Sequence, residues 1–310
     1  MANSQSIMDL ARAAHKGDHE AVVIACRHMI AREKPESRLR QALVQLLQNP
    51  SPNGVILSEV LPNDIKNLVL QIAPKLPLTD VMLPVEVSDN LFQLIKERVH
   101  LEALKEAGLS APHKILLSGP PGNGKTALAG AIATKLELPF FVLDYNKAIG
   151  SHLGETGSNL AKVFRSLNTT PCVLFIDEME TVLTERNGSK DDVGEMARIV
   201  SSLLLEIDRL PDNVVLIGAT NHSEMLDRAV IRRFEHHWEL PAPSEDSVDK
   251  WLEQFSERHP TIPVTKNKKE ILEGKKGWSF SDIERSALAW CRQWVVENKV
   301  NIHDLEKMAG

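Results

Sequence analysis

A stretch of eight residues near the middle of the chain has the residue types and spacing of a phosphate-binding loop. Residues 119–126 are GPPGNGKT, which fits the pattern G-x-x-x-x-G-K-[ST]. A short apolar run, Lys114–Ser118, precedes it, and a helix is expected to begin near Gly124. Backbone N–H groups and the N-terminus of such a helix surround phosphate oxygens. We therefore expect phosphate contacts from Gly119, Pro120, Pro121, Gly122, Asn123, Gly124, Lys125, Thr126 and Ala127.

Two side chains of this loop and two later carboxylates could carry out phosphoryl chemistry. Lys125 is expected to contact the β- and γ-phosphates, and the Thr126 hydroxyl is a ligand of the kind that Mg²⁺ prefers. The apolar run Cys172–Ile176 ends in Asp177 and Glu178. Asp177 is expected to hold the Mg²⁺ shell, while Glu178 acts as the general base that activates the attacking water. The combination predicts ATP hydrolysis with Mg²⁺ as the cofactor.

A further polar side chain follows another apolar run. Val214–Gly218 leads into Ala219, Thr220 and Asn221, and we expect this strand to lie between the two strands that carry the motifs above. Ligands bind at the carboxyl edge of open α/β sheets. Asn221 is therefore expected to bond the γ-phosphate or the attacking water, with turn capping as the simpler alternative.

Two adjacent arginines, Arg232 and Arg233, would by themselves be assigned to a solvated face. In order along the chain, however, the loop, the Asp-Glu strand, Ala-Thr-Asn and Arg-Arg-Phe together resemble the AAA family of ATPases over about residues 79–297. The spacing from Ala229 to Phe234 is similar to that of the katanin and spastin branch. The resemblance implies that both arginines are catalytic fingers that reach the γ-phosphate of an adjacent subunit in a ring. It also implies a homo-oligomer, expected to be a hexamer.

The resemblance extends to two other segments, with departures from the family pattern. Residues 277–283 (GWSFSDI) resemble the lid motif Gly-Phe-Ser-Gly-Ala-Asp-Ile, but Phe280 and Ser281 replace its small pair. Residues 79–81 occupy the place of the segment that borders the adenine, without its glycines. In the family, an aromatic residue two positions before Gly-Glu grips substrate in the central pore. His152 falls there, and it is either a weak, pH-dependent grip or a surface residue of a protein that does not thread its substrate.

The elements that position these residues predict the fold class. Three more assignments follow from the pattern: strands at Pro139–Leu143 and His236–Leu240, and a helix from Ser88 to Gly108. Strands that alternate with helices predict an α/β P-loop NTPase with a five-stranded parallel sheet. We expect a helical N-terminal region at 1–48 that docks a partner or packs as a cap, a linker at 49–78, the ATPase core at 79–243 and a small α-helical lid at 244–310.

Composition limits the possible partners. The 310-residue chain has a formal net charge of −6, which disfavours a nucleic-acid partner. Its three cysteines lack metal or disulfide spacing, and neither a signal peptide nor a membrane-length apolar run is visible. We therefore expect a cytoplasmic protein without a membrane partner.

Three functions are compatible with these features. The first is an ATPase ring that remodels or activates a protein partner. The chain also looks like bacterial AAA ATPases encoded beside a subtilisin-like serine protease in defence or plasmid-competition pairs, which implies such a protease as that partner. The second is a slow, nucleotide-dependent assembly switch or scaffold. The third, a DNA-associated ATPase, is disfavoured by the acidic charge balance.

Overall fold

A computed structural model of the chain describes Met8, Cys26 and residues 65–74, 76–148, 153–168, 170–183, 190–272 and 277–299. Side chains of 145–146, 153–155, 182–183, 190–199 and 299 lie outside this description. The chain divides into two compact units, residues 1–56 and 57–310. In the first unit only Met8 and Cys26 are described, both helical, so the predicted docking role of residues 1–48 stays a prediction.

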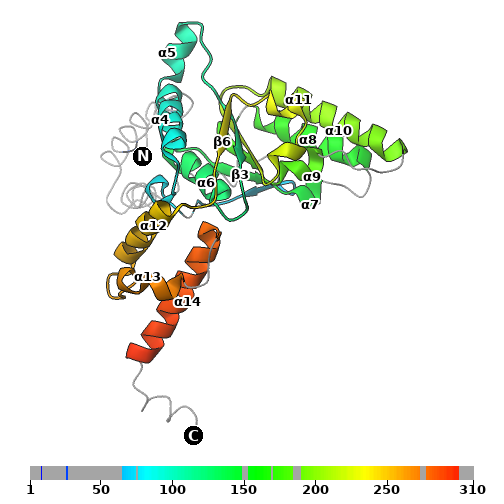
Figure 1. Cartoon of the computed structure of the whole chain (residues 1–310). Helices are drawn as coiled ribbons and strands as arrows, with labels where there is room; N and C mark the ends of the chain where they lie inside the picture. Colours follow the sequence, from blue (N-terminus) through cyan, green and yellow to red (C-terminus); the bar gives the residue numbers. More distant parts are fainter. Residues whose placement is uncertain are drawn as a thin grey trace, which may run out of the picture. The chain divides into compact units, whose positions relative to one another are not determined.

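The second unit is built around a six-stranded sheet with the order β1-β3-β4-β5-β2-β6. Figure 1 shows this sheet with helices beside it. Its strands are β1 (Val69–Gln71), β2 (Lys114–Ser118), β3 (Phe140–Leu143), β4 (Cys172–Ile176), β5 (Val214–Thr220) and β6 (His236–Glu239). All neighbours are parallel except β1, which pairs antiparallel with β3. The strand that ends in Asn221 lies between those that lead to the phosphate loop and to Asp177, as predicted.

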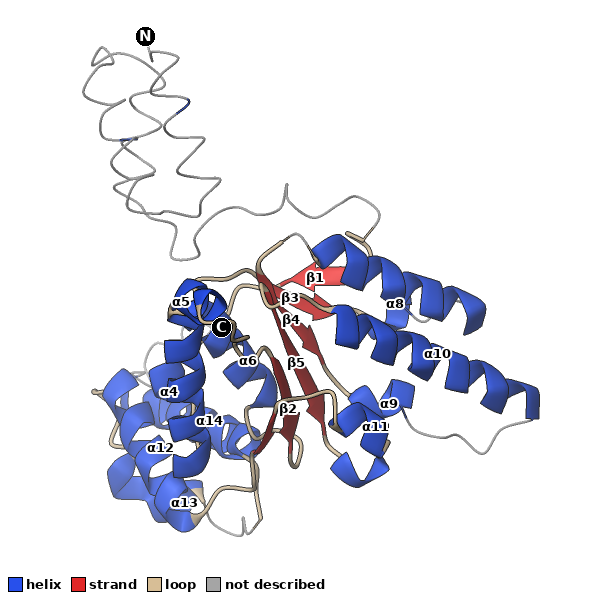
Figure 2. Ribbon diagram, turned by 90° about the horizontal axis from the view of Figure 1, so that it is seen from above, coloured by secondary structure: helices blue, strands red, loops and turns tan. Residues whose placement is uncertain are grey.

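Helices cover both faces of this sheet, because alternate strand residues point to opposite sides. On one face, odd-numbered residues of β2 such as Ile115 and Leu117 pack with α4 (Val85–Val99) and α6 (Lys125–Lys135). On the other face, Leu116 and Leu174 pack with α8 (Leu153–Leu167) and α10 (Lys190–Arg209). Figure 2 shows these two helical layers. Burial on both faces explains why the central strands are almost continuously apolar.

A third hydrophobic cluster belongs to the C-terminal helices. The rings of Trp251 and Phe255 in α12 (Glu245–Arg258) stack, with 4.9 Å between their centroids. They pack with Ile271 of α13 (Lys268–Ile271) and Ile283 of α14 (Phe280–Lys299). A capping box begins α14, since Ser279 and Asp282 exchange side-chain and backbone hydrogen bonds. This separate core supports the predicted lid, although the domain boundaries themselves remain predictions.

Two sequence assignments differ from the structure. The five predicted parallel strands are all present and the predicted α/β class is confirmed, but the sheet has a sixth strand, because Val69–Gln71, in the segment predicted as a linker, adds an antiparallel edge. Three residues are too few for a strand to show its period of two. The helix predicted from Ser88 to Gly108 begins at Val85, is interrupted at His100 and continues as α5 (Leu101–Glu106).

Among the helices that the structure describes, none is long and apolar enough to span a membrane.

Candidate functional site

The phosphate loop lies between β2 and α6, as its pattern requires. Gly119, at φ +134°, follows β2 directly, and a Cβ there would overlap the carbonyl oxygen of Leu240. The residue that follows β6 therefore lies against the start of the loop, where only glycine fits. Gly124 at φ +89° precedes Lys125, the first residue of α6. The loop thus meets the N-terminal end of an 11-residue helix, where backbone N–H groups are available to an anion.

Lys125 is buried and fully hydrogen-bonded. Its Nζ donates to the carbonyl oxygens of Gly119 (2.6 Å) and Pro120 (3.0 Å) and to Oδ1 of Asn221 (2.8 Å). Burial lowers the pKa of this ammonium, while the carboxylates of Asp177 and Glu180 oppose that shift. Three acceptors match the three donors of the group. A phosphate oxygen bound in the loop would therefore replace one of these acceptors on the Lys125 ammonium. Asn221, as one of them, lies where such a phosphate would bind.

Oxygen ligands suitable for a hard cation lie beside the loop. The Thr126 hydroxyl donates to Oδ2 of Asp177 at 3.3 Å, which joins the start of α6 to the end of β4. A hydroxyl and a carboxylate are the donors that Mg²⁺ takes together with water and phosphate oxygens. Thr126 and Asp177 therefore fit the predicted magnesium site. When bound, Mg²⁺ would neutralise charge that develops on the phosphates.

Glu178 follows Asp177 in a left-handed backbone conformation, with φ +49°. Its N–H donates to Oδ1 of Asp177 at 2.9 Å, and its side chain is exposed. Left-handed backbone at a residue other than glycine is uncommon and is often found at functional sites. An exposed carboxylate beside Asp177 can accept a proton from water, as a general base must.

Glu180 is a site residue that motif reasoning missed. It lies in the first turn of α9 (Met179–Leu183), and its Oε1 accepts from the backbone N–H of Asn221 at 3.1 Å. The same carboxylate raises the pKa of Lys125. Glu180 therefore orients Asn221 and supports the charge of Lys125. Its only signal in the sequence is a third acidic residue in Asp-Glu-Met-Glu.

Replacing Glu180 with alanine should lower kcat while the KM for ATP changes little. Without its acceptor, the Asn221 backbone can shift, and a displacement of about 1 Å in a catalytic group costs about 100-fold. We expect a loss of about 10- to 100-fold in steady-state ATPase assays. Glu180→Gln keeps an acceptor oxygen and should retain most of the activity. Equal losses in both variants would contradict a role through the Asn221 hydrogen bond.

The start of α14, in the segment predicted as a lid, contacts the phosphate loop directly. The carbonyl oxygen of Gly122 accepts from the backbone N–H (3.0 Å) and the hydroxyl (3.1 Å) of Ser281. Oδ1 of Asn123 accepts from the N–H of Phe280 at 3.3 Å. Phe280 and Ser281 are the residues that replace the small pair of the family motif. Their replacement therefore adds a hydroxyl contact between the lid and the loop.

Gly122→Ala should lower the affinity for ATP at least about tenfold. The residue has φ +78°, and an added Cβ would lie 2.5 Å from the Ser279 hydroxyl oxygen, so both backbone strain and a lid clash oppose alanine. Left-handed backbone at a residue other than glycine costs about 1–3 kcal/mol. Gly108→Ala is the matched control, because its φ is +72° and nothing lies within 4 Å of the added atom. Titration with a fluorescent ATP analogue should separate the two variants; similar affinities would refute the lid clash.

Beside the loop lies a cavity of about 110 Å³ between the core and the lid. Asp80, Val81 and Ala127 line it from the core, and Trp251, Arg258 and Phe280 line it from the lid. Arg258 and Asp80 form an ion pair at 3.7 Å across the cavity. Of the segment predicted near the adenine, Asp80 and Val81 line this cavity, whereas Thr79 lines a different one. Phe280 and Ser281, which depart from the lid motif, also line it. No motif in the sequence had pointed to Trp251 or Arg258 as lining this cavity.

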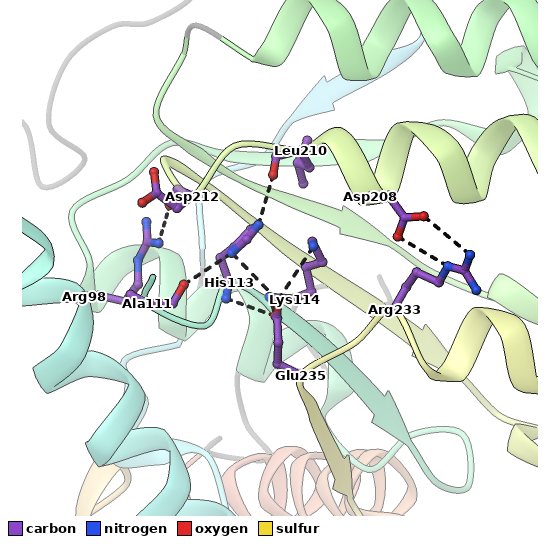
Figure 3. A network of polar contacts seen from close by, with 9 residues as sticks. All are labelled: Arg98, Ala111, His113, Lys114, Asp208, Leu210, Asp212, Arg233 and Glu235. Carbon is purple, nitrogen blue, oxygen red and sulfur yellow. Dashed lines mark hydrogen bonds and ion pairs between the residues drawn. The ribbon is translucent and has the colours of Figure 1, made fainter. Parts of the chain in front are cut away.

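The two arginines predicted as fingers have different surroundings. Both follow α11 (Arg228–Ile231). Arg233 donates to the carbonyl oxygen of Ala229 at 2.8 Å and forms a two-pronged ion pair with Asp208, with N–O distances of 3.3 and 3.4 Å (Figure 3). Arg232 is exposed, and within the described residues its side chain has no recorded hydrogen bond or ion pair. Arg232 is therefore available for a contact outside its own subunit. His152 lies outside the described residues.

Several known proteins are similar in sequence to this chain. Residues 115–242 match the family model described as ATPase family associated with various cellular activities (AAA). An uncharacterized AAA family ATPase of Sinorhizobium fredii is 31% identical over 243 residues, which cover 78% of this chain and 72% of that protein. A putative 26S proteasome regulatory subunit homolog of Methanocaldococcus jannaschii is 35% identical over 61% of this chain and 51% of its own length. The peroxisomal ATPase PEX6 of Komagataella pastoris is 35% identical over 58% of this chain but only 16% of its own length.

Proposed function

This chain belongs to the AAA family of ATPases, and we propose that it works as a ring, expected to contain six subunits, that couples ATP hydrolysis to the remodelling or activation of a protein partner. The observation that carries the proposal is the exposed Arg232 beside the anchored Arg233. An arginine without a partner in its own subunit can be presented to the nucleotide of the next one. Each nucleotide site is then completed only by assembly.

At each nucleotide site, the residues divide the chemistry as follows. Lys125 and the loop N–H groups bind the phosphates, and Thr126 and Asp177 hold Mg²⁺. Glu178 accepts a proton from the attacking water, which Asn221 orients. Arg232 of the adjacent subunit stabilises charge on the γ-phosphate in the transition state. Exchange of the Lys125 acceptors for phosphate oxygens frees Asn221 for this contact, so nucleotide binding and site assembly are linked.

A protein partner is proposed because one relative is named as a putative homolog of a 26S proteasome regulatory subunit, and the proteasome acts on proteins; a second relative is named as a peroxisomal ATPase. This chain spans about half of the first and one sixth of the second, so their partners do not transfer to it. The resemblance to ATPases encoded beside a subtilisin-like protease proposes that protease as the partner. We further propose remodelling over short distances, since histidine at position 152 offers less apolar area for grip than an aromatic ring.

A slow assembly switch is the second candidate, and two observations favour it. His152 replaces the aromatic pore residue, and Ser281 bonds the lid to the phosphate loop, which would slow nucleotide exchange. ATP turnover measured with and without the purified partner separates the two functions. A remodelling machine is stimulated by its substrate, whereas a switch is not. Stimulation by DNA would favour the DNA-associated ATPase instead.

The ring is tested by mixing two inactive variants. Lys125→Ala lacks a working pocket and Arg232→Ala lacks a finger, so a mixed ring contains some interfaces with both intact. ATP turnover of the mixture should exceed the sum of the separate preparations. No gain on mixing, together with a protein that sediments as a monomer in ATP, would remove the proposal.

A further inference from the structure

A second acidic residue fixes the segment that carries the arginines. Glu235 lies two residues after Arg233 and just before β6. Its Oε2 accepts from the backbone N–H groups of His113 (3.2 Å) and Lys114 (2.6 Å), and its Oε1 lies 3.7 Å from Nζ of Lys114. The carboxylate therefore binds the backbone of Lys114, the first residue of β2, and of His113, the residue before it (Figure 3). This is the strand that ends at the phosphate loop.

His113 extends the contact to the end of α10. The ring is buried, with Nδ1 3.3 Å from the carbonyl oxygen of Ala111 and Nε2 3.1 Å from that of Leu210. Burial lowers the pKa of His113, so a neutral ring donates to one of these two carbonyls near pH 7. Leu210 follows α10 directly and lies two residues after Asp208, the partner of Arg233.

These contacts close a frame of three short segments: 208–210, 113–114 and 233–235. Asp208 binds Arg233, the Leu210 carbonyl lies against His113, and the backbone of His113 binds Glu235, as Figure 3 shows. Between the two anchors of the last segment, Phe234 is buried in the core under the sheet. Arg232 precedes this anchored segment and is exposed. The frame therefore determines where Arg232 emerges from the surface.

We propose that Glu235 is a positioning residue, which ties the arginine segment to β2 and so holds Arg232 in register for the nucleotide of the adjacent subunit. The proposal rests on the proposed ring. Strand β2 connects the arginine segment to the phosphate loop. Glu235 binds Lys114 at the start of β2, and the loop follows Ser118 at its end. A carboxylate suits this role, since it accepts both N–H groups at once.

Glu235→Ala should lower kcat about 10- to 100-fold with the KM for ATP within about twofold, because a catalytic group displaced by about 1 Å loses about 100-fold. Glu235→Gln keeps one acceptor oxygen, and its kcat should lie between that of Glu235→Ala and that of the parent protein. Glu239→Ala is the matched control. Glu239 is also exposed and lies on β6, and its side chain has no hydrogen bond recorded in the described part of the chain.

The deciding experiment places Glu235→Ala in each half of the mixed ring. Added to the Lys125→Ala chain, which supplies only fingers, it should reduce the recovered ATPase activity about 10- to 100-fold. Added to the Arg232→Ala chain, which supplies only pockets, it should leave the recovered activity within about twofold. A loss in the pocket-supplying chain would instead mean that Glu235 acts on its own phosphate loop or on folding.

The outcomes are distinguishable. If the parent mixture recovers activity but Glu235→Ala in the finger-supplying chain changes nothing, the positioning role is wrong and the ring stands. Equal losses in both halves also overturn the positioning role. If the parent mixture recovers nothing, the proposed function fails, and the role given to Glu235 fails with it.

Discussion

Glu178→Gln is expected to bind ATP about as well as the parent protein and to hydrolyse it about 10²- to 10⁴-fold more slowly, the usual contribution of a general base. Glu178 is exposed beside Asp177 and makes no recorded side-chain contact with the loop in the described residues, so its loss leaves phosphate binding intact. Lys125→Ala should instead abolish nucleotide binding. Its ammonium lies within the loop itself, 2.6 Å from the Gly119 carbonyl oxygen.

Nucleotide titration and single-turnover hydrolysis measure the two effects separately. Glu86→Gln, an exposed carboxylate in the first turn of α4, serves as the control for loss of a surface charge and should match the parent in both assays. The division of roles would be refuted if Glu178→Gln and Lys125→Ala lost ATP affinity to the same extent. It would also fail if Glu178→Gln turned over ATP at the parent rate.

Arg232→Ala is expected to keep ATP affinity and to lose about 10³- to 10⁵-fold in kcat, the range found for arginines that act on a transferring phosphoryl group. Its side chain has no recorded partner among the described residues, so its removal should not alter thermal stability. Arg233→Ala should also reduce turnover, but through the frame. It removes the partly exposed ion pair with Asp208 and the hydrogen bond to the Ala229 carbonyl oxygen, and should therefore lower the melting temperature slightly.

The two arginines are thus separated by stability and not by activity alone. Thermal denaturation of both variants, with Arg292→Ala on an exposed part of α14 as control, should show a shift for Arg233→Ala only. A comparable shift in Arg232→Ala would mean that Arg232 has a structural contact in its own subunit. Unchanged turnover in Arg232→Ala would remove it as a finger.

The sequence alone determined the elements whose information is local. GPPGNGKT specifies a loop between a strand and a helix, and β2 and β4 have the bounds that their apolar runs predicted. Such runs are informative because strands buried on both faces must be apolar at nearly every position. The order of the motifs also led to the family and placed the Asn221 strand between its neighbours. Strand β1 was not predicted, because three residues at a sheet edge are too few to show a hydrophobic pattern.

The tertiary structure alone decided which polar groups act together. Lys125 and Asn221 are 96 residues apart, and Ser281 and Gly122 are 159 apart. A sequence contains many carboxylates of equal chemistry, and nothing local distinguishes Glu180 or Glu235 from an exposed residue such as Glu239. Packing selects among them, because only some are brought to unpaired N–H groups at the start of a strand or the end of another. The same packing anchors Arg233 on Asp208 and leaves its neighbour Arg232 exposed, a difference that two adjacent identical residue types cannot encode by themselves.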